Sequence, residues 1–446
     1  LRLRHCNSSD RNCRQHSLGY YIWLNADMAD RTLSCLVRHI SKAFVWERMS
    51  MARKSKLFSV QFIVLFLTLF AAGYCLYCLN STVSVYVESI GGTTSASGVL
   101  NTCFTVSACA ARLVGGHCAD RFGRKRIMIA GGLCIAAGTF GYSAITSFAS
   151  LMLFRGIQGV GYAMMSVGAS TAIIDVLPQD RLGEGIGISA IASTLAGSIA
   201  PSVGLAIVMQ FDFHTVFVST ALVALAGILS VFLFCNYEKK MPYGVAKNGD
   251  SRHRKRGRVL WQIFEKQAVL PAAVYTLFTT GFAITHVFMT LYALSSGIAN
   301  PGSYFIASSL CQVFARIAAG KSADRDNVMP VVIAGGVLGC LSYLGLAFTT
   351  NGIIYLISGA LFGLGNGLIG PVMNRLAVMD AEPARRGAAS ATYSISADIG
   401  NGIGGIIWGV LIDAVPYSTC FFIVSIWLVL ALGAAILFLA KRGKGR

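Results

Sequence analysis

The stretch GGHCADRFGRKRIM, residues 115–128, joins two long apolar runs and decides how the chain around it folds. Gly116 lets the helix before the turn pack closely against a neighbour, and Gly123 allows the chain to turn tightly. Asp120 can lie at the N-terminus of a neighbouring helix or pair with an arginine. The basic side chains of the turn can reach acidic groups such as Asp175; they are Arg121, Arg124, Lys125 and Arg126.

Apolar runs like those beside this turn continue along most of the chain. Of its 446 residues, 55% are hydrophobic and 13% are charged, whereas a soluble domain has about 25% charged residues. A soluble fold of this composition would expose large apolar patches, so most of the surface must face lipid. The chain is therefore predicted to be an all-α polytopic membrane protein.

Twelve of the runs approach the length of about 20 apolar residues that a bilayer-spanning helix needs. They fall into two sets of six. The first set is expected near residues 57–79, 95–116, 127–146, 148–175, 185–209 and 213–236, and the second near residues 268–294, 301–319, 328–349, 352–378, 387–412 and 417–440. We predict twelve transmembrane helices in two pseudo-symmetric six-helix bundles, residues 51–237 and 263–446.

Two further segments lie outside these bundles. Residues 238–262 are polar and basic, which predicts a flexible cytoplasmic linker between the bundles. Residues 1–50 contain neither a spanning run nor the pattern of a signal peptide. We expect this N-terminal extension to be non-native, with translation beginning at Met49 or Met51.

The basic residues are distributed unevenly between the two sides of the predicted bundles. Lys and Arg outnumber Asp and Glu by 37 to 19, a formal charge of +18, yet six loops contain neither Lys nor Arg. These loops lie near residues 80–94, 147, 210–212, 295–300, 350–351 and 413–416. Basic loops stay in the cytoplasm, so both termini are predicted to be cytoplasmic. This topology, together with contact with anionic lipid, explains the basic charge better than nucleic-acid binding does.

The two halves resemble each other at an offset of 204 residues. ARLVGGHCADR at 111–121 aligns with ARIAAGKSADR at 315–325, and both copies contain the same Ala-Arg pair and end in Ala-Asp-Arg. Like halves of this kind are expected when a binding site lies between them and the halves rock around it.

The turn at 116–125 resembles the hallmark motif of the major facilitator superfamily, G-x-x-x-D-R-x-G-R-[RK], with Cys118 where the family usually has leucine. The resemblance covers residues 57–440. It implies that the turn latches the inner face closed in the outward-open state, whereas a topology signal alone would explain the arginines but not the glycines and the aspartate. The gating residues that it implies are Gly116, Asp120, Arg121, Gly123, Arg124, Lys125 and Asp175, with Asp324 and Arg325 in the second copy.

A second motif, RGIQGVGYAM at 155–164, places an arginine inside a predicted span. Arg155 lies about 10 Å from the outer end of that helix, where a guanidinium is retained only if it meets a partner or a water-filled cavity. The string resembles the R-x-x-Q-G-x-G motif of proton-coupled members of the superfamily, which assigns Arg155 and Gln158 to coupling. A structural, hydrogen-bonding arginine is the alternative.

A third motif, GSIAPSVGLAI at 197–207, predicts a kink and a closely packed helix face at Gly197, Pro201 and Gly204. It resembles the G-x-x-x-G-P-x-x-G-G motif of the drug:proton antiporter branch. It departs from that motif because Ala200 precedes the proline and Leu205 replaces the second glycine. A packing face without directional meaning is the alternative.

Two further ionisable side chains are candidates for proton coupling. Asp398 lies about 18 Å from the inner end of its predicted helix, near mid-bilayer, where an unpaired aspartate could carry a proton. A structural hydrogen bond to Asn401 is the alternative. His286, in the outer third of its helix, could couple protons or contact substrate.

Asn80 and Asn366 are further candidates for the wall of a substrate cavity. No catalytic or metal site is predicted, and the CxxC formed by Cys75 and Cys78 is interpreted as apolar packing.

These features predict a secondary active transporter, not an enzyme, that exports a small drug-like molecule or metabolite in exchange for protons by alternating access. The chain has no G-x-x-x-x-G-K-[ST] string, so the proton gradient is the expected driving force and no cofactor is expected. The alternative is a proton-coupled importer or a facilitator of a nutrient. The expected partners are the substrate, protons and membrane lipids but no nucleic acid, and the protein is expected to be a monomer in the cell membrane.

Overall fold

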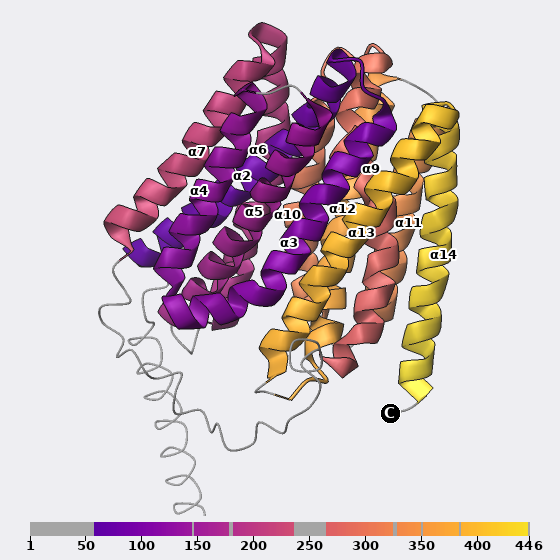
Figure 1. The fold of residues 1–446 in the computed structure, drawn as a ribbon. Coiled ribbons are helices and arrows are strands. Elements are labelled where there is room, and N and C mark those ends of the chain that lie inside the picture. The colour runs from indigo at the N-terminus through magenta and orange to yellow at the C-terminus, as the bar shows by residue number, and fades with distance from the viewer. Residues whose placement is uncertain are drawn as a thin grey trace, which may run out of the picture. The chain divides into compact units, whose positions relative to one another are not determined.

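The computed structural model describes residues 58–144, 147–177, 182–235, 265–323, 328–348, 351–382 and 385–444. Within these ranges the regular structure is helical, without β-strands (Figure 1). The predicted extension at 1–50 and linker at 238–262 lie outside the described residues, as do Asp324 and Arg325.

Twelve long helices form the described part of the chain, as the sequence predicts. Those of the first half are α2 (Val60–Ser89), α3 (Thr94–Phe122), α4 (Arg124–Ala144), α5 (Phe148–Val176), α6 (Leu182–Gln210) and α7 (Phe213–Phe234). Those of the second half are α9 (Val269–Ser295), α10 (Ser303–Ala323), α11 (Val328–Phe348), α12 (Gly352–Val378), α13 (Arg386–Ala414) and α14 (Tyr417–Lys444), preceded by the short 3₁₀-helix η5 (Lys266–Ala268). Eleven are long and apolar enough to cross a membrane, and the apolar part of α10 is shorter, Ser303–Ala319.

Helix α2 ends ten residues later than predicted, at Ser89 instead of residue 79. The sequence predicts a loop over 80–94, because NSTVS is polar, but the helix continues to Ser89. The polar side chains are accommodated by bonds to the preceding turn: the Thr82 hydroxyl donates to the Cys78 carbonyl (2.8 Å). The Ser84 hydroxyl also donates to the carbonyl of Val287 on α9 (2.7 Å), so this segment joins the two halves.

The two halves use the same pairs of neighbouring helices. In the first half α2 packs on α6, α3 on α5 and α4 on α7; in the second half the matching pairs are α9 with α13, α10 with α12 and α11 with α14. The halves stand side by side in Figure 1. The predicted pseudo-symmetric pair of six-helix bundles is confirmed at the level of packing.

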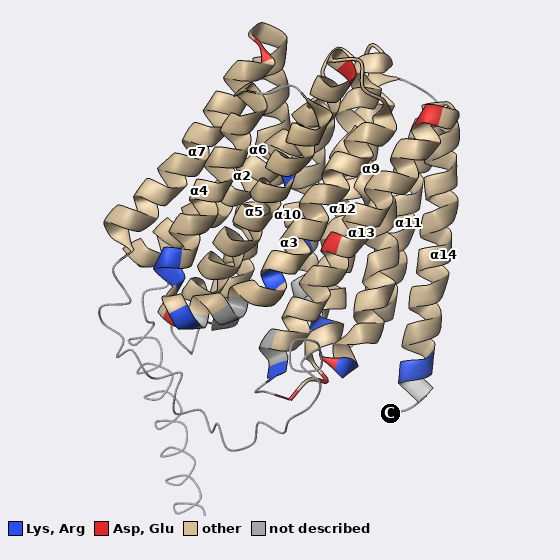
Figure 2. Ribbon diagram, in the orientation of Figure 1, with Lys and Arg blue, Asp and Glu red and all other residues tan. Residues whose placement is uncertain are grey.

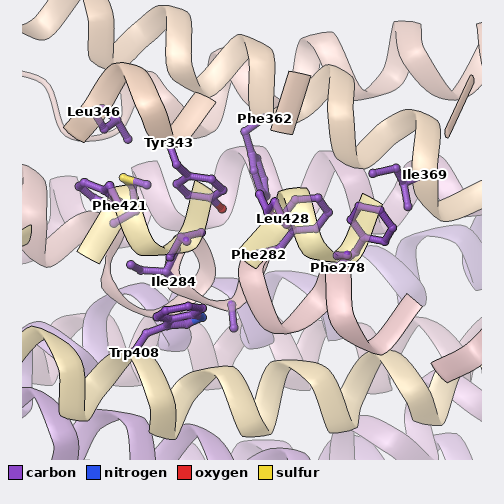
Figure 3. Close-up of a cluster of buried hydrophobic side chains, with 14 of the residues drawn as sticks. Phe278, Phe282, Ile284, Tyr343, Leu346, Phe362, Ile369, Trp408, Phe421 and Leu428 are labelled. Atoms are coloured by element: carbon purple, nitrogen blue, oxygen red, sulfur yellow. The ribbon is translucent and has the colours of Figure 1, made fainter. Parts of the chain in front are cut away.

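An aromatic core stiffens the second half (Figure 3). Phe282 of α9 packs edge-on against Phe362 of α12, with ring centroids 5.2 Å apart. The buried indole of Trp408 donates to the Thr280 carbonyl (2.6 Å), which ties α13 to α9. Hydrogen bonds from buried aromatic side chains fix the position of α9, and α9 places His286 next to the first half.

The ends of the bundle differ in charge. We call the end where α3 turns into α4 at Gly123 the lower end, and the end where α2 turns toward α3 at Gly91 the upper end. Basic residues gather toward the lower end, and the turns at the upper end carry acidic residues (Figure 2). This distribution is the one on which the predicted cytoplasmic position of both termini rests.

The longest contact between the halves runs along α3 and α13. Toward its upper end the backbones nearly touch: a Cβ atom added to Gly98 would lie 2.1 Å from the carbonyl oxygen of Gly405. Small residues permit such an approach, and Thr102 uses it to donate to the Gly402 carbonyl (2.8 Å). At the upper end Asp413 of α13 accepts the backbone N–H of Thr94 (2.9 Å), so it caps α3 across the interface.

The Gly98 contact generates a direct test. In Gly98→Ala the new methyl group collides with backbone, so we expect α3 and α13 to separate there and the free energy of unfolding to fall by about 1–3 kcal/mol. Gly433→Ala is the matched control, because a Cβ at Gly433 meets nothing within 4 Å. The measurement is the thermal unfolding of both variants in detergent. Equal midpoints for the two variants would contradict the close contact.

Candidate functional site

An ion pair joins the halves near the middle of their helices. Nε of Arg112 on α3 lies 2.7 Å from Oδ2 of Asp398 on α13, and the two side chains are 16% and 17% exposed. At 1.5 Å per residue, Asp398 lies about 18 Å and Arg112 about 15 Å from the lower ends of their helices. The Arg112 guanidinium also lies over the ring of Tyr162, 5.4 Å from its centroid.

This pairing revises the surroundings that the sequence predicts for Asp398. Arg112 supplies a counter-charge that the sequence does not predict. The alternative partner, Asn401, donates instead to the Ala397 carbonyl (3.0 Å). Arg112 is missing from the predicted site, although an arginine within an apolar run that recurs in both halves was a signal for it. That Asp398 carries the transported proton stays a prediction.

Three predicted residues meet in a second cluster, inside the first half. Arg155 on α5 is only 2% exposed. Its guanidinium donates to the side-chain oxygens of Asn80 on α2 and of Gln158 (2.9 Å). Tyr142 donates to the same Gln158 oxygen (3.1 Å), and Arg155 lies over the Phe104 ring. All these partners are neutral, so the described contacts of Arg155 leave its charge uncompensated.

His286 lies across the interface from the first half. Its ring centroid is 5.9 Å from that of Tyr77 on α2 and 6.0 Å from that of Phe362 on α12. Asn366 is partly buried, one turn beyond Phe362 on α12. His286, unlike Asn366, thus has a described contact with the other half.

The predicted gating residues lie at the lower end. Gly123 adopts φ +91°, which explains the need for glycine in this turn. Nε of Arg124 lies 2.7 Å from Oδ2 of Asp175, and Lys125 donates to the Phe232 carbonyl (2.8 Å). Arg121 lies over the ring of the adjacent Phe122.

These contacts of Arg124 and Lys125 join helices of one half. Gly116 and Asp120 are part of α3, but the surroundings of these two residues lie outside the described part of the structure. Asp324 and Arg325 lie outside it entirely. The latch between halves therefore stays a prediction. The second half also has an ion pair at its lower end, but a different arginine forms it: Nη2 of Arg442 on α14 lies 2.7 Å from Oδ2 of Asp380.

The third motif forms a packing face between α6 and α2. A Cβ atom at Gly204 would lie 2.6 Å from Sγ of Cys78, and one at Gly197 would lie 3.5 Å from the Tyr77 ring. Helix α6 continues through Pro201 without a break. The glycines therefore let Tyr77 and the rest of α2 lie against α6, and their bearing on transport direction stays a prediction.

Among the described residues, no group of three or more His, Cys, Asp or Glu side chains is placed to hold a metal ion. The side chains that the structure brings together are a carboxylate paired across the interface, a buried arginine held by neutral groups, and an imidazole between aromatic rings.

The central ion pair is expected to be energetically coupled. Asp398→Asn alone leaves Arg112 without its counter-charge and should lower the free energy of unfolding by about 2 kcal/mol or more. Adding Arg112→Gln should recover part of this loss, because both charges are then gone. The measurement is a double-mutant cycle from denaturant titrations in detergent.

The Arg442–Asp380 pair supplies the control cycle, since it lies at the lower end and Asp380 is 42% exposed. Its coupling should stay below about 1 kcal/mol. Additive effects of Asp398→Asn and Arg112→Gln would contradict the central pair.

Comparison with known proteins agrees with this architecture. The family model described as "Major Facilitator Superfamily" matches residues 65–383 and again residues 302–446. The staphylopine export protein of Staphylococcus aureus is 21% identical over 381 residues, which cover 80% of this chain and 92% of that protein. The quinolone resistance protein NorA of Staphylococcus aureus is 25% identical over 361 residues, which cover 79% and 90%.

The solved structures include similar folds. The crystal structure of the nucleoside transporter NupG matches with a TM-score of 0.68 and 14% identity, covering 86% of this chain and 98% of that one. At this identity the likeness concerns the fold alone. With twelve paired helices, two like halves and a family match over most of its length, this chain is a multi-pass membrane transport protein that belongs to the major facilitator superfamily.

Proposed function

We propose that this transporter exports a small organic molecule in exchange for protons by alternating access. The observation that carries the proposal is the Arg112–Asp398 ion pair, which joins the halves at mid-depth. In this proposal the lower end faces the cytoplasm, the protein works as a monomer in the cell membrane, and Asp398 is the carboxyl group that takes up and releases the proton.

The chemistry of the pair supports coupling. An ion pair of low exposure is stable while both members are charged, and losing one charge leaves the other unpaired. Protonation of Asp398 therefore removes the attraction to Arg112 and weakens the interface between α3 and α13, which we call the seam. Proton uptake and separation of the halves become one event, which is the requirement for coupled transport.

The contacts at the upper end fit one step of this cycle. The Asp413 cap and the Gly98–Gly405 approach hold α3 to α13 above the ion pair. This arrangement corresponds to an inward-facing, deprotonated state that receives substrate from the cytoplasm. Opening of the upper end would then release substrate, and Asp398 would take up an external proton as its ion pair with Arg112 separates.

Two observations support export as the direction of transport. One is the α6 motif at 197–207, which departs in part from its antiporter pattern. The other is the pair of relatives named for export and for quinolone resistance, at 21% and 25% identity.

The test is proton movement in liposomes that contain the full chain. A panel of quinolones and aromatic metabolites is added while an internal dye records pH. A substrate that leaves one side should drive protons the opposite way, and Asp398→Asn should abolish the pH change.

Asp212→Asn is the matched control, because Asp212 caps α7 through the Thr215 N–H (2.7 Å), a role that asparagine can also fill. This variant should exchange protons normally. Proton and substrate movement in the same direction would make the protein an importer, and substrate movement without proton flux in the native chain would refute the role of Asp398.

A further inference from the structure

Arg316 on α10 is the counterpart of Arg112 in the internal repeat, 204 residues later. It also lies at a contact between the halves, since its guanidinium donates to the Ala190 carbonyl on α6 (3.2 Å). The α3–α13 interface and the α10–α6 interface are thus equivalent, and each holds one of the repeated arginines.

The second interface lacks the acid that completes the first. At the same offset, the residue of α6 that corresponds to Asp398 is Thr194. The Thr194 hydroxyl donates to the Ala190 carbonyl (3.3 Å), the same oxygen that accepts from Arg316. The position of the missing carboxylate is therefore next to Arg316, and an uncharged hydroxyl occupies it.

The guanidinium of Arg316 retains unused bonding capacity. Its Nε atom is buried and has no hydrogen-bond partner within the described ranges. Its described polar contact is to a backbone carbonyl, and no carboxylate of the described residues lies within ion-pair distance of it. A cation in this position gains most from an anion that offers two oxygens, because the planar guanidinium binds carboxylates through two parallel bonds.

Aromatic side chains of three other helices lie against α6 and α12, the two helices that pack on α10. The Tyr77 ring of α2 lies 3.5 Å from the Cβ position of Gly197 on α6, and the hydroxyl groups of Tyr275 of α9 and Tyr393 of α13 each lie 3.5 Å from that of Gly370 on α12. The rings of Tyr275 and Tyr393 are stacked, with centroids 4.5 Å apart, and the Tyr393 hydroxyl donates to the Gly370 carbonyl (2.8 Å). Such rings suit an apolar or aromatic molecule whose charged end reaches the arginine.

The charge balance favours an anion. Arg112 and Asp398 neutralise each other, while the described surroundings leave Arg316 with its positive charge. We propose that Arg316 binds the carboxylate of an amphipathic organic anion, which takes the place that Asp398 occupies in the other interface. This inference rests on the proposed transport function, whose substrate class it names.

The test measures binding without any ion gradient. The full chain in detergent is titrated with benzoate, phenylacetate and naphthoate, each compared with its neutral amide, and the midpoint of thermal unfolding is recorded. A ligand that binds only the folded state raises this midpoint. We expect the carboxylates to raise it and the amides to leave it nearly unchanged.

The variants assign the effect to one side chain. Arg316→Gln should weaken the apparent affinity for the carboxylates about tenfold or more. Arg316→Lys keeps the charge and should retain part of the binding. Arg442→Gln removes an arginine at the lower end and should bind as the native chain does. The Lys variant and the comparison of acid with amide keep the test decisive even if Arg316→Gln does not fold.

Three results would overturn the proposal: equal stabilisation by acids and amides, unchanged affinity in Arg316→Gln, or no stabilisation of the native chain at millimolar carboxylate. Failure of proton coupling is separable from these. Carboxylate binding that depends on Arg316, in a chain that moves no protons, would refute the role of Asp398 and leave this site standing.

Discussion

A guanidinium and a carboxylate that meet within a membrane-spanning bundle stabilise each other only as a pair. Arg112 and Asp398 lie 286 residues apart in sequence and come from different halves, so their contact exists only while α3 and α13 lie together. Each charge alone would be costly at this depth. The pair therefore ties the ionisation of one carboxyl group to the relative position of two bundles, and the surrounding seam has to permit that contact without making it permanent.

The seam meets this requirement through small residues. Gly98 and Gly405 bring two backbones together without interlocking side chains, and Asn101 and Thr102 donate to carbonyl groups of α13. Bonds to backbone carbonyls can be exchanged for water at modest free-energy cost, since a typical intramolecular hydrogen bond contributes about 1 kcal/mol net. The aromatic core of the second half is built differently, with interlocking rings around Phe282 and Phe362 that resist rearrangement. Motion between the bundles is thereby easier than motion within the second one.

The sequence predicts the positions of the helices better than the contacts between the two halves. Helix ends follow from apolar runs and turn residues, and most fall within a few residues of their expected positions because membrane thickness sets the length of each run. The exception is α2, where a polar run at 80–84 suggests a loop. Hydroxyl groups such as that of Thr82 bond to the preceding turn, and this local compensation does not appear in a pattern of apolar residues. The partner of Asp398 is harder still to predict from the sequence, because no local rule relates two helices that are far apart in the chain.

The repeat supplies the information that local patterns lack. Equivalent positions in the two halves face equivalent interfaces, so a contact found in one half identifies where its counterpart lies in the other. Here the counterpart of the Arg112–Asp398 pair keeps its arginine and replaces its acid with Thr194. If both interfaces held an ion pair, the centre would be balanced without substrate. Because one acid is missing, the arginine of the second interface stays available for an anion from outside the chain. In the proposed mechanism, this departure from symmetry gives the proton a position in one interface and the substrate a position in the other.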